Sequence, residues 1–142
     1  MRPSSTPVRR LLAASLFVIA SACSSSSTDA NPLAGSYVAT TLEVTPSGQS
    51  MIDVLAMGCV LGITIASDNS TSGSLLVPAS IAGVAFTESM AGSAVQTGSS
   101  VRFTQLAATF VRNLTFTVNG STLQAANQVL NGTTFNVVLT RQ

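Results

Sequence analysis

The side chains that could carry out chemistry in this chain are few and lie far apart. The sequence holds five acidic residues and six arginines, but no histidine and no lysine. Without histidine the chain lacks the commonest general acid–base group and the usual partner of a serine or cysteine nucleophile. Glu43, Asp53, Asp68 and Glu88 are isolated in the sequence, so no catalytic carboxylate pair is predicted. We therefore expect no catalytic residues, no metal ligands, no cofactor and no enzyme activity.

Two cysteines remain, and their surroundings differ. Cys23 follows small residues and precedes a serine-rich run, Ser24 to Thr28, whereas Cys59 lies in an apolar stretch. No neighbouring cation or second thiol would lower the pKa of Cys59, so we expect a small buried side chain there rather than a redox centre. If Cys23 stays unmodified in an oxidising compartment, a Cys23–Cys59 disulfide is the alternative.

Residues 1–22 have the pattern of a secretory signal peptide. Arg2, Arg9 and Arg10 precede the apolar run Leu11 to Ala20, and small residues follow it. As a helix this run would extend roughly 15 Å, about half of a bilayer core, so it is too short for a transmembrane span. From Cys23 onward the chain holds three arginines and five acidic residues. Its net charge of −2 excludes nucleic-acid binding through a basic surface.

The segment Ile19 to Cys23 resembles the lipobox of bacterial lipoproteins, with Ala20 where that pattern usually has Leu. The resemblance implies that Cys23 becomes the first mature residue and carries two or more acyl chains, enough for stable membrane anchoring. Ser24 in the next position implies sorting to the outer membrane in enteric-type bacteria. Residues 23–33 are then a lipidated, Ser-rich tether. Ala20 to Ala22 also fits ordinary signal cleavage, so a secreted or periplasmic soluble protein is the alternative.

Residues 34–142 have the pattern of short strands separated by turns. Apolar and polar residues alternate in Val60 to Ala66, Leu114 to Val118 and Thr133 to Arg141. Asp68 to Ser70 reads as a turn, and Asn119-Gly120 predicts a type I′ hairpin turn. Seven or eight such strands in succession favour an antiparallel meander, which leaves bare edges unless it closes. We predict an all-β domain that forms a small up-and-down β-barrel, with a two-sheet β-sandwich as the alternative.

Three short motifs resemble those of the small lipocalin-like domains found behind bacterial lipoprotein leaders. They are Leu33 to Tyr37, Asp53 to Ile65, and Met90 to Ala94 followed by Val101 to Phe103. The resemblance implies a lipocalin-like barrel over residues 34–142. Members of that group often have Trp or Tyr where this chain has Ala94, so the interior either gains space there or is repacked by a neighbour.

The strand pattern also predicts which side chains face the interior. They are the candidate ligand contacts or core residues Leu61, Ile63, Ile65, Val101, Phe103, Leu114, Phe116, Phe135, Val137 and Leu139. One hypothesis is a membrane-anchored barrel that binds a small hydrophobic ligand, which requires an apolar cavity of at least about 300 Å³ open to solvent. The other is a structural or protein-interaction lipoprotein with a packed core and an exposed apolar patch or strand edge.

Overall fold

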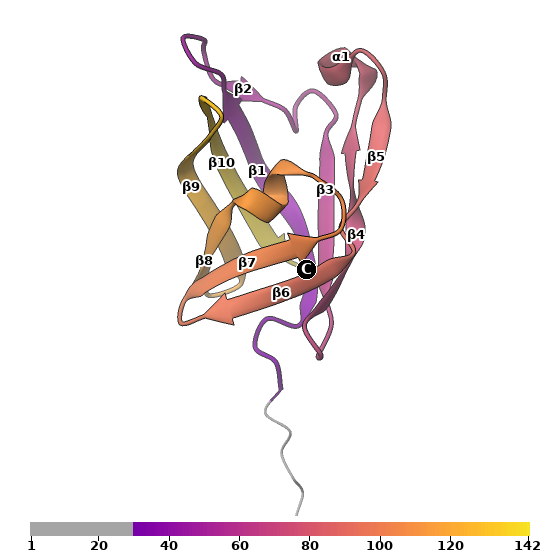
Figure 1. Ribbon diagram of the computed structural model, residues 1–142, viewed down its shortest axis with the longest axis vertical. Coiled ribbons are helices and arrows are strands. Elements are labelled where there is room, and N and C mark those ends of the chain that lie inside the picture. The colour runs from indigo at the N-terminus through magenta and orange to yellow at the C-terminus, as the bar shows by residue number, and fades with distance from the viewer. Residues whose placement is uncertain (1–29) are drawn as a thin grey trace, which may run out of the picture.

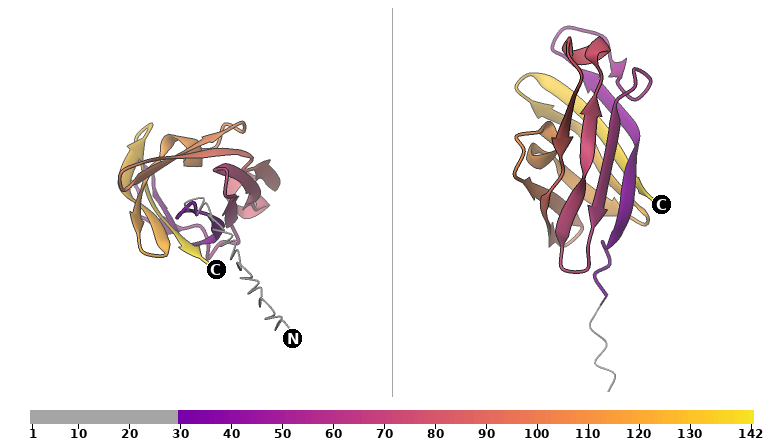
Figure 2. Two further views of the ribbon diagram at one scale, coloured as in Figure 1. Left: turned by 90° about the horizontal axis from the view of Figure 1, so that it is seen from below. Right: turned by 90° about the vertical axis from the view of Figure 1, so that its right-hand side faces the viewer.

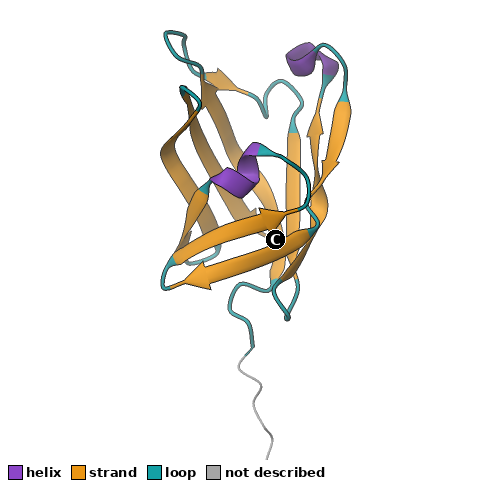
Figure 3. Ribbon diagram, in the orientation of Figure 1, coloured by secondary structure: helices purple, strands orange, loops and turns teal. Residues whose placement is uncertain are grey.

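The computed structural model describes residues 30–142, which form ten strands and two short helical turns (Figures 1 and 3). The predicted signal peptide, Cys23 and most of the predicted tether lie outside the described residues. No helix in the described part is long and apolar enough to cross a bilayer. The strands are β1 (Gly35–Thr45), β2 (Ile52–Asp53), β3 (Val60–Ile65), β4 (Ser70–Val77), β5 (Phe86–Ser89), β6 (Gly92–Thr97), β7 (Ser100–Gln105), β8 (Thr115–Asn119), β9 (Thr122–Leu130) and β10 (Thr133–Arg141). The helical turns are α1 (Ala79–Ala82) and the 3₁₀ turn η1 (Phe110–Asn113).

Eight of the strands close into an antiparallel up-and-down barrel. Around the wall they follow the order β1, β3, β4, β6, β7, β8, β9 and β10, and β10 then pairs with β1. The closing ladder runs from the Tyr37–Arg141 pair to the Thr45–Thr134 pair. Seen from below, the wall forms a ring (Figure 2). The predicted barrel is therefore confirmed, and the sandwich alternative is wrong, because closure pairs the edge strands that a sandwich would leave bare.

Tight turns set the register of consecutive strands, and one of them differs from the prediction. Asp68 acts as an Asx-turn residue, since its carboxylate accepts hydrogen bonds from the Ser70 backbone N–H (2.9 Å) and hydroxyl (2.6 Å). Between β8 and β9, Asn119 pairs with Thr122, so the two loop residues are Gly120 and Ser121. Of these two only Gly120 has a positive φ, 58°. The predicted type I′ turn at Asn119-Gly120 is wrong by one residue, because a serine in the second loop position favours a turn with positive φ at glycine alone.

The interior near the first described residues is filled by side chains. Phe103 and Phe116 meet edge to face, with ring centroids 5.4 Å apart and an interplanar angle of 73°. Both rings are buried. Ala94 lies directly opposite Phe103 across the β6–β7 ladder. The two phenylalanine rings therefore supply the bulk that Ala94 lacks.

The end of the barrel where the chain enters β1 is closed by a cluster of Leu33, Tyr37 and Arg141. Leu33 and Tyr37 are buried at 1% and 2% exposure. The Tyr37 hydroxyl donates to the Leu33 carbonyl at 2.9 Å and accepts from Arg141 Nε at 3.0 Å. The Arg141 guanidinium also lies 5.2 Å from the centroid of the Tyr37 ring and donates to the Pro32 carbonyl. An opening to the interior must therefore lie at the other end.

Candidate functional site: the apolar mouth of the barrel

The predicted interior residues fall into two groups. Nine are fully buried: Leu61, Ile63, Ile65, Val101, Phe103, Leu114, Phe116, Val137 and Leu139. The tenth, Phe135, is only half-buried and lies near the open end of the barrel. The first nine thus belong to the packed core, and of the ten only Phe135 borders the apolar cavity at the open end.

That cavity, which we call the apolar mouth, lies at the end of the barrel away from Leu33. Its volume is about 120 Å³. Every side chain that lines it is apolar: Leu42, Val44, Val54, Cys59, Val77, Ile81, Phe110 and Phe135. It is smaller than the roughly 300 Å³ of an ordinary small-molecule site. An apolar cavity of about 150 Å³ is nevertheless large enough for a benzene-sized group.

Two strands change partners along their length, and this opens the mouth. β4 pairs with β6 only at Ser70 and Thr71, and from Ser74 onward it pairs with β5 instead. β1 pairs with β3 over its first half and with β2 at Glu43 and Val44. Beyond these switches β2 and α1 lie at the upper end of the molecule, and β5 lies beside the upper part of β4 (Figure 1). The mouth is therefore lined partly by the ends of barrel strands β1, β4 and β10, and partly by α1, η1 and the segment between β2 and β3.

Gly73 lies at the point where β4 changes partners. Its φ is 122°, and its carbonyl accepts a hydrogen bond from Met90 N–H at 3.0 Å. A Cβ atom there would lie 2.2 Å from the carbonyl oxygen of Gly62. Only glycine lets β3 and β4 approach so closely while β4 changes partners.

Two aromatic rings form one wall of the mouth. Phe110 in η1 stacks on Phe135 in β10, with centroids 5.0 Å apart and an interplanar angle of 15°. On β9, two residues, Ala126 and Asn127, lie opposite the single residue Asn136, which is a β-bulge next to Phe135. The bulge is held by the Asn127 N–H, which donates to the Asn136 side-chain oxygen at 2.7 Å.

The segment between β2 and β3 forms the opposite wall. Val54 N–H donates to the Leu42 carbonyl and Cys59 N–H to the Val54 carbonyl, both at 3.0 Å. This segment contains no helix and forms an irregular plug. The Cys59 thiol is buried, donates to the Leu76 carbonyl at 3.1 Å, and forms no disulfide within the described residues. Burial raises the pKa of Cys59, which disfavours the reactive thiolate.

Apolar side chains continue outward from the mouth onto the surface. Phe86 lies directly opposite Val77, and Ile52 directly opposite Val44, so each extends the face of a residue that lines the cavity. Phe86 is 43% exposed, and Val84, two residues earlier in the chain, is 76% exposed. We call Ile52, Val84 and Phe86 the apolar rim. An apolar group that is too long for the cavity could pack its outer part against the rim.

Most residues of the mouth are not predicted from the sequence. Val44, Val54, Val77, Ile81 and Phe110 lie at strand ends or in the connections that the sequence left without a predicted role. Their shared signal is that each is an apolar residue in or beside an irregular segment. Nothing in the local pattern says that these segments meet.

Two of the acidic residues lie opposite each other near the mouth. The structure places Glu43 directly opposite Asp53 on β1 and β2, although they are distant in the sequence. Glu43 lies between Leu42 and Val44, which line the mouth, and therefore faces outward. Asp53 accepts hydrogen bonds from Leu55 and Ala56 N–H at 3.0 and 3.1 Å, as a turn residue does. No group of three or more potential metal ligands occurs among residues 30–142.

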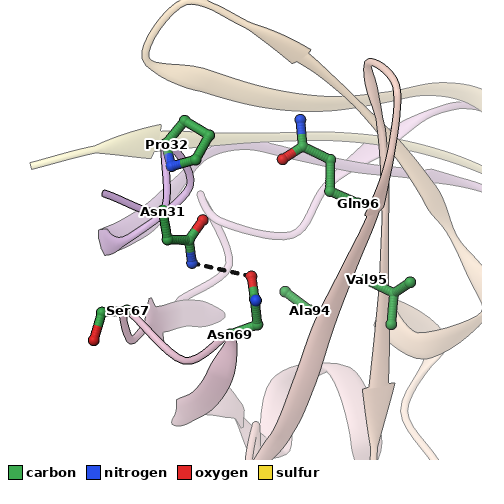
Figure 4. Close-up of a pocket in the computed structure, with 7 residues that line it drawn as sticks. All are labelled: Asn31, Pro32, Ser67, Asn69, Ala94, Val95 and Gln96. Atoms are coloured by element: carbon green, nitrogen blue, oxygen red, sulfur yellow. Dashed lines mark hydrogen bonds between the residues drawn. The ribbon is translucent and has the colours of Figure 1, made fainter. Parts of the chain in front are cut away.

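A second, polar hollow lies at the other end of the molecule, between the first described residues and β6 (Figure 4). Its volume is about 500 Å³, and no charged side chain lines it. The Asn31 amide donates to Asn69 Oδ1 and to the Ala66 carbonyl, both at 3.0 Å. These contacts fasten the start of the domain to the β3–β4 turn, which suffices to explain the polar residues there.

Comparison of the chain with protein families, with curated proteins and with solved structures finds no match.

Proposed function

We propose that this chain is a lipid-anchored, non-catalytic lipoprotein of the cell envelope, with a filled lipocalin-like barrel that binds an apolar side chain of a protein partner at its mouth. One observation carries the choice of partner: the interior is packed, and the apolar cavity holds only about 120 Å³. A barrel that encloses a ligand would need about 300 Å³ or more. An exposed apolar rim around a small cavity suits a side chain presented by another protein.

The first described residues and the mouth lie at opposite ends of the domain. The first described residues enter β1 next to Leu33 and Tyr37, whereas α1 and β2 stand at the far end (Figure 1). A membrane attachment at Cys23 would therefore leave the mouth facing away from the lipid surface. This orientation supports display of the mouth to a partner in the envelope.

Mass spectrometry of the protein from its own host tests the anchor. We expect the mature N-terminus to be Cys23 with a diacylglyceryl group, and the protein to fractionate with membranes. Cys23→Ala should release it into the soluble fraction, whereas Cys59→Ala should not. An unmodified Cys23 in the wild-type protein would refute the anchor.

A photo-crosslinking residue at Val84 tests the mouth. The control position is Val38, which is also exposed but pairs with Gly62 in the lower half of the wall. We expect a discrete adduct of protein mass from Val84 and none from Val38. The double variant Ile81→Asp, Phe86→Asp should abolish the Val84 adduct, since carboxylates would have to be desolvated in the complex. Equal labelling at both positions would refute a specific site.

A small apolar ligand is the second candidate, because the lining of the mouth contains only apolar side chains. This candidate predicts that native mass spectrometry detects a small molecule that co-purifies with the wild-type protein and is lost from the Ile81→Asp, Phe86→Asp variant. Repeated preparations that carry no such molecule would exclude it and leave the protein partner.

A further inference from the structure

The described residues contain three arginines, and one of them is used to close the barrel. Arg141 donates to Tyr37 and to the Pro32 carbonyl. The other two, Arg102 and Arg112, are both exposed and both line one groove on the outer wall, with a volume of about 270 Å³. No acidic side chain lines this groove. In a domain with so few charges, two cations without an acidic partner in the same groove need a physical explanation.

The barrel wall brings these two arginines together although they come from different elements. Arg102 lies on the outer face of β7, where the ladder between β7 and β8 ends at the Arg102–Thr115 pair. Beyond this pair the chain leaves the wall and returns through η1, which carries Arg112. The groove follows this separation, and an adjoining hollow of about 360 Å³ continues it past Arg112 to Asn113.

Neutral donors complete the lining of this arginine groove. Thr97 and Ser100 flank the β6–β7 turn and border it. Val95, directly opposite Arg102 on β6 and 51% exposed, adds an apolar side. Thr104 and Phe103 complete the lining, so the groove combines two guanidinium groups with hydroxyl and apolar side chains on a single open surface.

We propose that Arg102 and Arg112 form a binding site for a phosphate group. Guanidinium groups present planar sets of N–H donors that match the oxygens of phosphate and donate two bonds at once. A bound anion would also offset the repulsion between the two cations, which no acidic side chain in the groove relieves. This site is distinct from the apolar mouth and does not depend on the function proposed for it. The phosphate belongs either to a phospholipid headgroup or to a soluble phosphate compound.

Equilibrium binding of inorganic phosphate and flotation with vesicles test the site and distinguish the two sources. The vesicles contain either neutral phospholipid alone or neutral with anionic phospholipid, and all proteins carry Cys23→Ala so that acyl chains cannot contribute. Low ionic strength keeps the surface charges unscreened. Arg102→Gln and Arg112→Gln should each weaken binding about tenfold or more.

The double variant Gln49→Glu, Ser50→Asp is a matched control. It lowers the net charge by two, as Arg102→Gln, Arg112→Gln does, but in the exposed loop between β1 and β2. If the arginine variants lose phosphate binding and the control keeps it, the result supports a soluble phosphate compound as the ligand. Arginine-dependent flotation with anionic vesicles and no binding of free phosphate supports a lipid headgroup. Three outcomes would overturn the proposal. The protein binds neither phosphate nor vesicles, or binding survives both arginine substitutions, or the control variant loses binding as much as the arginine variants do.

Discussion

Gly73→Ala is the substitution that most directly tests how the mouth is built. A Cβ atom at this position would lie 2.2 Å from the Gly62 oxygen, 2.9 Å from the Gly62 carbonyl carbon and 3.1 Å from Ile63 Cα. All three are backbone atoms, so no side-chain rotation relieves the clash. β3 and β4 must move apart, or β4 must give up the partner change that separates β5 from β6.

The magnitude follows from two costs. An alanine at a φ of 122° is disfavoured by about 1–3 kcal/mol through its backbone alone. Each ladder hydrogen bond lost as the strands separate adds about 1 kcal/mol. We therefore expect a loss of about 3 kcal/mol or more, a large part of the roughly 5–15 kcal/mol that stabilises a typical domain. In thermal unfolding this corresponds to a decrease of about 12 °C in Tm.

Gly98→Ala is the matched control for this prediction. Gly98 has a φ of 60°, and nothing lies within 4 Å of the Cβ atom it would gain. Its substitution should cost about 1 kcal/mol from the left-handed backbone alone. Urea unfolding followed by circular dichroism gives both free energies, with an unchanged m value as the check on comparable unfolding. If the two variants lose stability within about 1 kcal/mol of each other, the close approach at Gly73 does not constrain the fold and the reasoning is wrong.

Three further predictions concern the core and the two ends of the barrel. Phe103→Leu, Phe116→Leu and the double variant should show a coupling of about 0.5–1.5 kcal/mol in urea unfolding; additive losses would contradict the edge-to-face contact. Tyr37→Phe should cost about 1.5–3 kcal/mol, because it removes a hydroxyl that accepts from a charged guanidinium. Ser36→Ala, at an exposed neighbour, should stay within about 0.5 kcal/mol of wild type, and equal losses would contradict the proposed closure. Burial raises the pKa of Cys59 above its usual 9.0, so the unfolded chain loses this proton first as pH rises and stability falls on the alkaline side. We expect the Tm of the wild type to fall more steeply than that of Cys59→Ala as the pH rises through the pKa of the thiol. Identical Tm-against-pH profiles for the two proteins would contradict the raised pKa.

Much of the architecture is predictable from local sequence. Alternation along Val60 to Ile65 and Thr133 to Arg141 identified strands and their inward faces because side-chain direction in a strand has a period of two. The need to pair edge strands then favoured a closed barrel, which the structure has. At Asn119-Gly120 the prediction failed by one residue, because neighbouring positions near a glycine support different two-residue turns and the cross-strand register selects between them.

The candidate sites were harder to predict from the sequence than the fold. The mouth is assembled from strand ends, α1, η1 and an irregular plug, and these lie side by side only because β1 and β4 each change partners. Arg102 and Arg112 show the same limitation. They lie ten positions apart in the chain, and they share a groove because β7 and β8 diverge and η1 crosses the gap.

The sequence by itself determined the absence of histidine and lysine and the alternating strands of a barrel, and it predicts an export signal that ends at Cys23. These properties depend on residue type and short-range periodicity, and not on contacts between residues that are distant in the chain. Tertiary structure decided that the interior is filled, that a small apolar cavity opens at one end, and that two arginines line one groove on the wall with no acidic residue in it. Each of these depends on which segments distant in the chain become neighbours, and barrel closure determines that.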